Sequence, residues 1–204
     1  MAEPLRAVAI NCTLKTGPES SSTDVILTEV LAELREHDVE TGTIVRAVDH
    51  DIRPGVTSDE GAGDAWPAIR RQVLDADILV LGTPIWLGQP SSVAHRVLER
   101  MDAFLGEADD DGRMITFDKV AIVAVVGNED GAHHVSAELF QALNDVGFTV
   151  PANGATYWVG EAMRGIDYKD LEHRPRTTHG TNATVARHAA HLARLLRGDP
   201  YPAG

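Results

Sequence analysis

The sequence predicts an α/β protein with a parallel sheet and helices on both of its faces. Short apolar runs rich in β-branched residues alternate along the chain with longer segments whose apolar residues recur at helical spacing. No two strand-like runs are joined by a tight hairpin turn, so no antiparallel pair is expected. The resulting succession of strand, helix, strand and helix is typical of a parallel sheet covered on both sides.

Five strands are expected, each a short apolar run. The run at residues 119–126, KVAIVAVV, is the most apolar and is therefore expected near the centre of the sheet, buried on both faces. The last strand is expected in two pieces around Pro151 and Gly154. The expected strands are residues 5–11, 39–48, 77–82, 119–126, and 148–150 with 155–159.

Five amphipathic helices are expected between and after these strands. Ser22 and Thr23 precede the first helix and offer hydroxyl oxygens that can cap its N-terminus. The expected helices are residues 24–37, 65–74, 91–104, 132–146 and 182–197. Residues 50–64 form a loop long enough to be functional or mobile, and residues 160–180 an irregular elaboration. One domain over residues 1–204 accounts for the whole pattern.

The composition narrows the class of function. The formal net charge of −13 disfavours nucleic acid and anionic membranes as partners, because both are negatively charged. Solubility alone can explain such acidity, and a docking face for a basic redox partner is the alternative. No apolar run is long enough to span a bilayer and no secretory signal is evident, so a cytoplasmic protein is expected. Cys12 is the single cysteine, which excludes an intrachain disulfide.

Three loops follow strand ends and are expected along one edge of the sheet. The first, residues 12–23, is rich in hydroxyls and precedes a helix, an arrangement that favours a phosphate. An ordinary capped, Ser-rich turn is the alternative. It lacks a Walker motif and a G-x-G-x-x-G motif, and Pro18 stands where a cysteine phosphatase needs arginine. The candidate residues here are Thr13, Lys15, Ser21, Ser22 and Thr23.

The second loop, residues 83–90, places backbone amides and carbonyls beside an aromatic ring. A flat, partly polar heterocycle needs these edge hydrogen bonds and a face to lie against. The alternative is a proline-kinked turn with Trp86 packed in the core. The candidate residues are Pro84, Ile85, Trp86, Leu87 and Gly88.

The third loop, residues 127–131, could hydrogen-bond the polar edge of the same ring, because glycines permit close backbone approach. A simple strand-to-helix turn with Asp130 as the N-cap is the alternative. The candidate residues are Gly127, Asn128, Glu129, Asp130 and Gly131. No metal site is expected, because the nine histidines form no recognisable ligand pattern, and no G-x-S-x-G motif indicates a serine hydrolase.

The chain resembles the flavodoxin-like NAD(P)H-dependent FMN reductase superfamily at these loops. Its Gly82-Thr-Pro-Ile-Trp-Leu-Gly-Gln-Pro-Ser91 segment is similar to the family's flavin loop, and Ser21-Ser-Thr23 is similar to its Ser-Asn-Thr phosphate pattern, with Ser22 where Asn is commoner. The resemblance implies a flavodoxin-like three-layer sandwich with five parallel strands in the order 2-1-3-4-5. It also implies FMN bound noncovalently, with its phosphate on the first loop and its ring between the other two.

The resemblance further implies an enzyme that passes electrons from NAD(P)H through FMN to a quinone, a flavin or a similar small acceptor. No side chain need act as a catalytic acid or base, because hydride passes directly to the flavin. Homodimers or homotetramers are common in the family, and residues 49–63 and 160–178, with Tyr168, Arg164, Arg174 and Arg176, could complete a partner's site. A flavodoxin-type electron carrier, or a domain that has lost its cofactor, are the alternatives.

Overall fold

The computed structural model describes residues 3–162 and 165–203. Its strands form one sheet in which β2, β1, β4, β6 and β7 lie side by side and run parallel. This path has the predicted order 2-1-3-4-5, with β6 in the interior of the sheet. The strands are β1 (Leu5–Asn11), β2 (Val39–Thr41), β3 (Val45–Arg46), β4 (Ile78–Trp86), β5 (Gln89–Pro90), β6 (Val120–Gly127) and β7 (Ala155–Val159).

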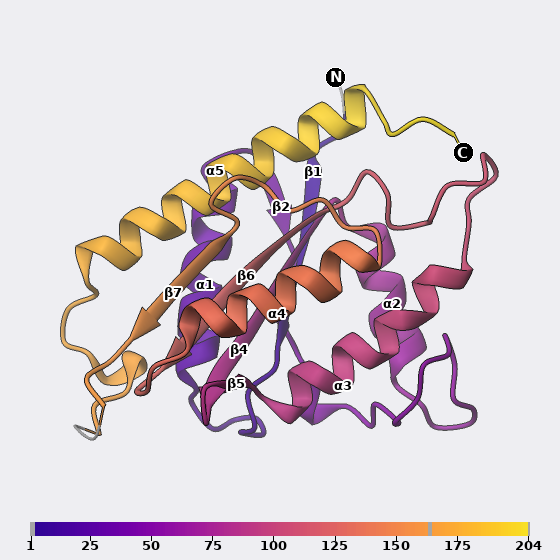
Figure 1. Ribbon diagram of the computed structural model, residues 1–204. Coiled ribbons are helices and arrows are strands. Elements are labelled where there is room, and N and C mark those ends of the chain that lie inside the picture. The colour runs from indigo at the N-terminus through magenta and orange to yellow at the C-terminus, as the bar shows by residue number, and fades with distance from the viewer. Residues whose placement is uncertain (1–2, 163–164, 204) are drawn as a thin grey trace.

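Helices cover both faces of the sheet (Figure 1). Side chains of α2, α3 and α4 form one apolar core with the sheet, and those of α1 and α5 form the other. Alternate residues of β6 enter the two cores, and seven of its eight residues are buried, as expected for an interior strand. The helices are α1 (Ser22–Arg35), α2 (Trp66–Asp75), α3 (Ser92–Met101), α4 (Ala132–Asp145) and α5 (Arg176–Gly198).

The sheet has seven strands rather than five, because two expected segments behave differently. The segment predicted as residues 39–48 gives both β2 and β3. Leu5 of β1 pairs with Val39 and Ile10 with Val45, so one extra residue is accommodated between the two pairs. Such an insertion is a bulge, which divides the strand. A short 3₁₀ helix, Ala47–Asp49, then ends it.

The expectation of no antiparallel hairpin was wrong. Strand β4 continues beyond Gly82 to Trp86, turns through Leu87 and Gly88, and pairs antiparallel with β5. Both turn residues have positive φ, 54° and 73°, as the tight two-residue hairpin requires. Leucine is unusual in this conformation, so the sequence carried no hairpin signal.

Other boundaries also differ from the prediction. Helix α1 begins at Ser22 rather than at residue 24 and its N-cap is Ser21, so the expectation that Ser22 and Thr23 cap it was wrong. Helix α5 begins at Arg176, within the segment expected to be irregular, and a 3₁₀ turn covers Tyr168–Asp170. The first piece of the last strand is reduced to a single bridge between Thr149 and Val120. Within the part of the chain that the structure describes, no helix is long and apolar enough to cross a membrane.

Candidate functional site

A cavity of about 210 Å³ opens at the carboxyl ends of β1, β4 and β6, where open α/β sheets hold their ligands. All three candidate loops contribute to its wall, so loops distant in sequence meet at one place. Eleven predicted residues line it: Thr13, Lys15, Ser21, Ser22, Thr23, Pro84, Ile85, Trp86, Gly127, Asn128 and Glu129. Leu87, Gly88, Asp130 and Gly131 lie next to these residues in the chain but outside the lining.

The first loop ends at the N-terminus of α1, whose first-turn N–H groups have no acceptor within the helix. The Ser21 hydroxyl oxygen accepts the N–H of Asp24 at 3.0 Å, Ser22 that of Lys169 at 3.2 Å, and Thr13 that of Lys15 at 3.3 Å. Each hydroxyl therefore uses a lone pair within the protein and keeps its own proton to donate. A wall of hydroxyl donors at a helix N-terminus suits an anion.

An arginine that sequence reasoning missed holds this loop in shape. The Arg46 guanidinium donates to the carbonyl oxygens of Glu19 at 2.7 Å and Lys15 at 3.3 Å, and it also pairs with the Asp24 carboxylate. Asn11 donates to the other oxygen of Asp24 at 2.6 Å. Arg46 therefore neutralises the one carboxylate in the first turn of α1, which would otherwise repel an anion there.

The second loop forms the apolar side of the cavity. Pro84, Ile85 and Trp86 line it, and the exposed fraction of the Trp86 residue is 52%, so the ring is not packed in the core. Leu87, at the tip of the hairpin, is 92% exposed. Large apolar side chains in such positions are available to a ligand rather than to the fold.

The third loop supports the second. The Glu129 carboxylate accepts the N–H of Leu87 at 3.0 Å and that of Gly88 at 3.2 Å. Gly131 is the N-cap of α4, with φ 123°, and an added Cβ would lie 2.8 Å from the Cα of Gly88. The alternative in which Asp130 is the N-cap of this helix was wrong, because Gly131 occupies that position. The Oδ1 of Asp130 accepts the N–H of Gly131.

A fourth wall comes from residues that were not among the predicted site residues. Trp158 of β7 and Tyr168 line the cavity, with ring centroids 5.3 Å apart, and Asp167 accepts the side-chain N–H of Asn128 at 2.7 Å. Trp158 and Asp167 carry no motif, so only their three-dimensional position identifies them. Tyr168 was expected only to contribute to a partner's site, whereas here it lines the cavity of its own chain.

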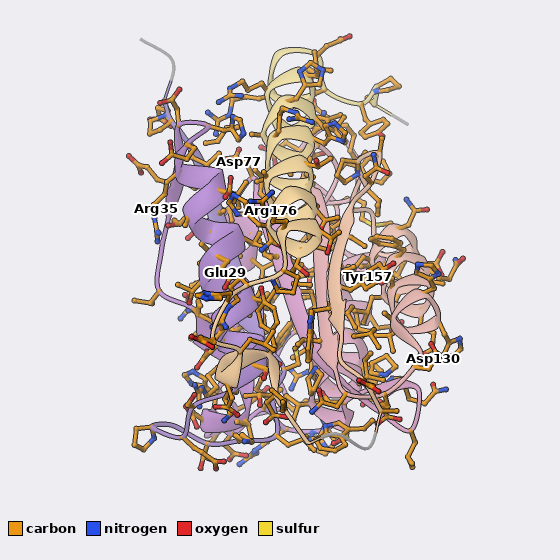
Figure 2. All side chains as sticks on the ribbon, turned by 90° about the vertical axis from the view of Figure 1, so that its left-hand side faces the viewer. Glu29, Arg35, Asp77, Asp130, Tyr157 and Arg176 are labelled. Atoms are coloured by element: carbon orange, nitrogen blue, oxygen red, sulfur yellow. The ribbon has the colours of Figure 1, made fainter. Side chains whose placement is uncertain are left out.

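Tyr168 is held in place by a hydrogen bond to Glu29 of α1, which is labelled in Figure 2. The Tyr168 hydroxyl donates to Glu29 at 2.5 Å, and Arg174 pairs with the same carboxylate at 2.9 Å while its guanidinium lies 4.8 Å from the Tyr168 ring centroid. Burial and the hydrogen bond to Glu29 raise the pKa of Tyr168 well above its usual value. Arg174 therefore already has an ion-pair partner and an aromatic contact within its own chain. Arg164 lies outside the described residues.

Among the residues that the structure describes, the side chains near the cavity include no exposed thiol and no cluster of three metal-ligating groups. Cys12 is fully buried, and this burial raises the pKa of its thiol far above the ordinary value, which disfavours the reactive thiolate. Among the described residues, no three His, Cys, Asp or Glu side chains gather as a metal site. What remains is a cavity with hydroxyl donors at one end and apolar, aromatic walls at the other.

Strand order, helix layers and the position of this cavity together define a flavodoxin-like protein. An archaeal flavodoxin shares the fold, with a TM-score of 0.58 at 8% identity over 93% of this chain and 99% of that one. Residues 5–163 match the family described as NADPH-dependent FMN reductase. The chain belongs to this family, whose members are flavin oxidoreductases, and the resemblance seen in the sequence is confirmed.

Two relatives align over nearly the whole chain. The "8-demethyl-8-aminoriboflavin-5'-phosphate synthase" of Streptomyces davaonensis is 34% identical over 209 residues, which cover 97% of this chain and 80% of that protein. A crystal structure of RosB with the bound intermediate 8-demethyl-8-formylriboflavin-5'-phosphate has a TM-score of 0.87 at 32% identity, over 97% of this chain and 82% of that one.

A third relative is much longer. The "Divalent metal cation transporter MntH" of Mycobacterium bovis is 40% identical over 200 residues, which make up 95% of this chain but only 29% of that protein. The present chain therefore spans less than a third of this relative's length.

Proposed function

We propose that the protein binds FMN in this cavity and passes electrons from NAD(P)H through the flavin to a quinone, a flavin or a similar small acceptor. The proposal rests on how polar and apolar groups are distributed in the cavity. Hydroxyl donors and a helix N-terminus lie at one end, and aromatic and apolar side chains lie at the other. A phosphorylated flat ring has a matching distribution, with an anionic phosphate at one end and a largely apolar ring at the other.

The phosphate would bind at the first loop. Thr13, Ser21 and Ser22 can each donate a hydroxyl proton to it, because their oxygens already accept backbone N–H groups. Lys15 now pairs with Glu19 at 3.1 Å, and it could move to a phosphate oxygen. The first-turn amides of α1 would add hydrogen bonds and the favourable helix dipole.

The ring would lie between the second and third loops. Pro84, Ile85 and Trp86 offer an apolar face, and residues 127–129 offer backbone groups at the edge of the cavity. Bound flavin would supply the capacity to accept a hydride and release its electrons, so the protein needs no acid or base of its own. The protein's task is to orient the ring, exclude water from one face and leave the other face open.

The remaining expectations follow from the same proposal. We expect a cytoplasmic homodimer or homotetramer without a nucleic-acid or membrane partner, because a net charge of −13 repels both kinds of surface. The acceptor would be a small molecule able to enter beside Trp86 and Leu87. Of the alternatives, an electron carrier would bind FMN but would need a separate reductase.

The decisive experiment compares FMN with riboflavin. Purified protein should quench FMN fluorescence and bind FMN at least tenfold more tightly than riboflavin, a difference of about 1.4 kcal/mol attributable to the phosphate. Oxidation of NADPH or NADH by a quinone should then depend on bound FMN. Failure to bind either flavin would refute the proposal. FMN binding without turnover would exclude the reductase and is expected both of an electron carrier and of an enzyme that modifies the flavin.

Modification of the flavin itself is a second candidate function. It is favoured by the 34% identity to the Streptomyces davaonensis synthase and by the TM-score of 0.87 with RosB. Under this alternative FMN is the substrate and is changed at its 8-methyl group. Mass spectrometry of the flavin would distinguish the two after incubation with the protein, an amino donor and dioxygen, which serves as the oxidant that conversion of a methyl to a formyl group requires. Reduction followed by reoxidation returns FMN unchanged, whereas synthase activity gives a flavin with formyl or amino in place of the 8-methyl group.

A further inference from the structure

Strand β7 is an open edge of the sheet. Gly154, just before it, accepts the N–H of Val123 at 3.0 Å, and Gly160, just after it, donates to Gly127 at 2.8 Å. Since hydrogen bonds alternate along a strand, the even-numbered residues between them also face β6. The N–H and C=O groups of the odd-numbered residues, Ala155, Tyr157 and Val159, therefore face away from the sheet. In the described part of the chain no hydrogen bond to these outward groups is seen.

An uncharged trough of about 650 Å³ follows this edge between α4 and α5. Its walls include Ser136, Ala137 and Phe140 from one helix and Thr181 and Thr184 from the other. None of the residues that line it is Asp, Glu, Lys or Arg, although 24% of the chain is charged. His133, whose Nε2 lies 3.0 Å from the Tyr157 hydroxyl, also lines the trough. The surface along this open edge therefore carries no acidic side chain, Lys or Arg.

The other edge of the sheet is protected, and β7 is not. Strand β2 has three residues, includes Glu40 and is followed by the bulge that precedes β3. Short length, charge and bulges are the usual means of preventing edge pairing. Strand β7, with the sequence ATYWV, contains no charge and no proline, and Tyr157 and Val159 are each 38% exposed. Figure 2 shows Tyr157 between α4 and α5, on the side of the molecule that carries this edge.

We propose that β7 pairs antiparallel with β7 of a second copy of this chain, joining the two sheets across a two-fold axis. In this arrangement Tyr157 lies opposite Tyr157 of the second copy, and Ala155 lies opposite Val159. The strand is complementary to itself, because each outward N–H meets an outward C=O, as an isologous interface requires. The inference concerns the edge of the sheet and does not depend on what the cavity binds.

The net charge of the chain favours a second copy, rather than a basic partner, as the molecule that binds along β7. Two chains of net charge −13 repel wherever acidic surface meets acidic surface, so self-association requires an uncharged face, and the β7 trough is such a face. A basic partner would instead be drawn to the acidic surface elsewhere. Small side chains at Ser136 and Ala137 leave room for the walls of the two troughs to approach each other.

Mass measurement by sedimentation or light scattering tests the proposal directly. The wild-type chain should be a dimer, and added salt should strengthen it by screening the net repulsion. Tyr157→Lys places two like charges opposite each other at the axis and should weaken association at least a hundredfold. Leu195→Lys is the matched control, because Leu195 is also an exposed apolar residue, 54% exposed, but lies near the other end of α5. It should leave the dimer intact.

Crosslinking tests the same contact between the two β7 strands without introducing a charge that could destabilise the fold. The one native cysteine, Cys12, is buried, so a cysteine introduced at the surface is the only accessible thiol. Tyr157→Cys should give a covalent dimer with a short bis-maleimide, whereas Leu195→Cys should not. A monomeric wild-type chain, or a Tyr157→Lys variant that remains folded and dimeric, would overturn the proposal. Circular dichroism of each variant shows whether it is folded.

Discussion

The carboxylate of Glu129 accepts the backbone N–H of Leu87 at 3.0 Å. This hydrogen bond from the third loop stabilises the hairpin turn in the second loop. Leu87 has φ 54°, a conformation that costs a non-glycine residue about 1–2 kcal/mol. The second oxygen of Glu129 accepts the next amide, that of Gly88, at 3.2 Å. The strained turn is therefore stabilised by a residue from another loop, and strain of this kind concentrates at functional sites.

Replacement of Glu129 by alanine should loosen the hairpin and weaken FMN binding. Loss of two charge-assisted hydrogen bonds leaves the Leu87 and Gly88 amides without their acceptor, and we expect FMN affinity to fall about tenfold, or about 1.4 kcal/mol. Flavin fluorescence titration measures the effect. Glu138→Ala, which removes a carboxylate from the outer side of α4, is the control and should bind FMN as the wild type does. Equal affinity in both variants would contradict the role of Glu129.

Gly131→Ala should destabilise the protein much more than Gly112→Ala. Both glycines have positive φ, 123° and 78°, but only at Gly131 would the new Cβ meet backbone, 2.8 Å from the Cα of Gly88. At Gly112 no atom lies within 4 Å, so the cost should be about 1 kcal/mol, from the backbone conformation alone. Gly131→Ala should cost about 3 kcal/mol, because the second and third loops must also move apart. Urea unfolding of the two variants gives the comparison, and equal losses would show that the two loops do not press on each other.

Most of the fold was predictable because it depends on local apolar patterns. The first strand has the predicted bounds, residues 5–11, and the interior position of β6 followed from its composition. The missed features depend on the context of single residues. Leu87 occupies a turn position that favours Asn or Gly, and the first turns of α5 are rich in Thr, His and Gly, which weakens their helical signal.

The cavity was only partly predictable, for a related reason. Its three loops follow strand ends, which a parallel sheet places along one edge, so their proximity could be inferred from strand order alone. Arg46 and Tyr168 act through partners far away in the sequence: Arg46 pairs with Asp24, 22 residues away, and Tyr168 bonds to Glu29, 139 residues away. No spacing or motif connects such pairs, and only the folded chain brings them together.

Arg46→Met should impair the binding of FMN more than that of riboflavin. The substitution leaves the Asp24 carboxylate uncompensated beside the N-terminus of α1, where we expect the phosphate, and it releases the carbonyls of Lys15 and Glu19. We expect FMN affinity to fall about tenfold or more and riboflavin affinity to change little, since riboflavin has no phosphate. The double variant with Asp24→Asn should recover part of the loss. If both flavins lose affinity equally, Arg46 acts only through the shape of the loop.

The buried ion pair between Arg100 and Asp64 should make stability fall in acid. Both side chains are fully buried and 2.8 Å apart, and Arg100 also donates to the carbonyls of Thr57 and Arg53, so this pair anchors the long loop before α2. Burial by itself would raise the pKa of Asp64. Hydrogen bonds from the N–H groups of Glu60 and Trp66, and from Arg100, outweigh it and lower the pKa to about 2.

The sign of the pH effect follows from that lowered pKa. In the unfolded chain Asp64 should titrate near its ordinary pKa of about 3.9, so the folded state binds fewer protons between pH 4 and 2. The stabilisation is therefore complete above about pH 4 and is lost as the pH falls toward 2, by about 2 kcal/mol. Asp64→Asn, which cannot titrate, should be less stable than wild type at neutral pH, and the gap should narrow in acid. Arg100→Met, which strands a buried carboxylate, should cost about 3–5 kcal/mol at neutral pH. Urea unfolding at pH 7 and pH 3 measures these differences, and a gap between wild type and Asp64→Asn that stays constant with pH would show that Asp64 has an ordinary pKa.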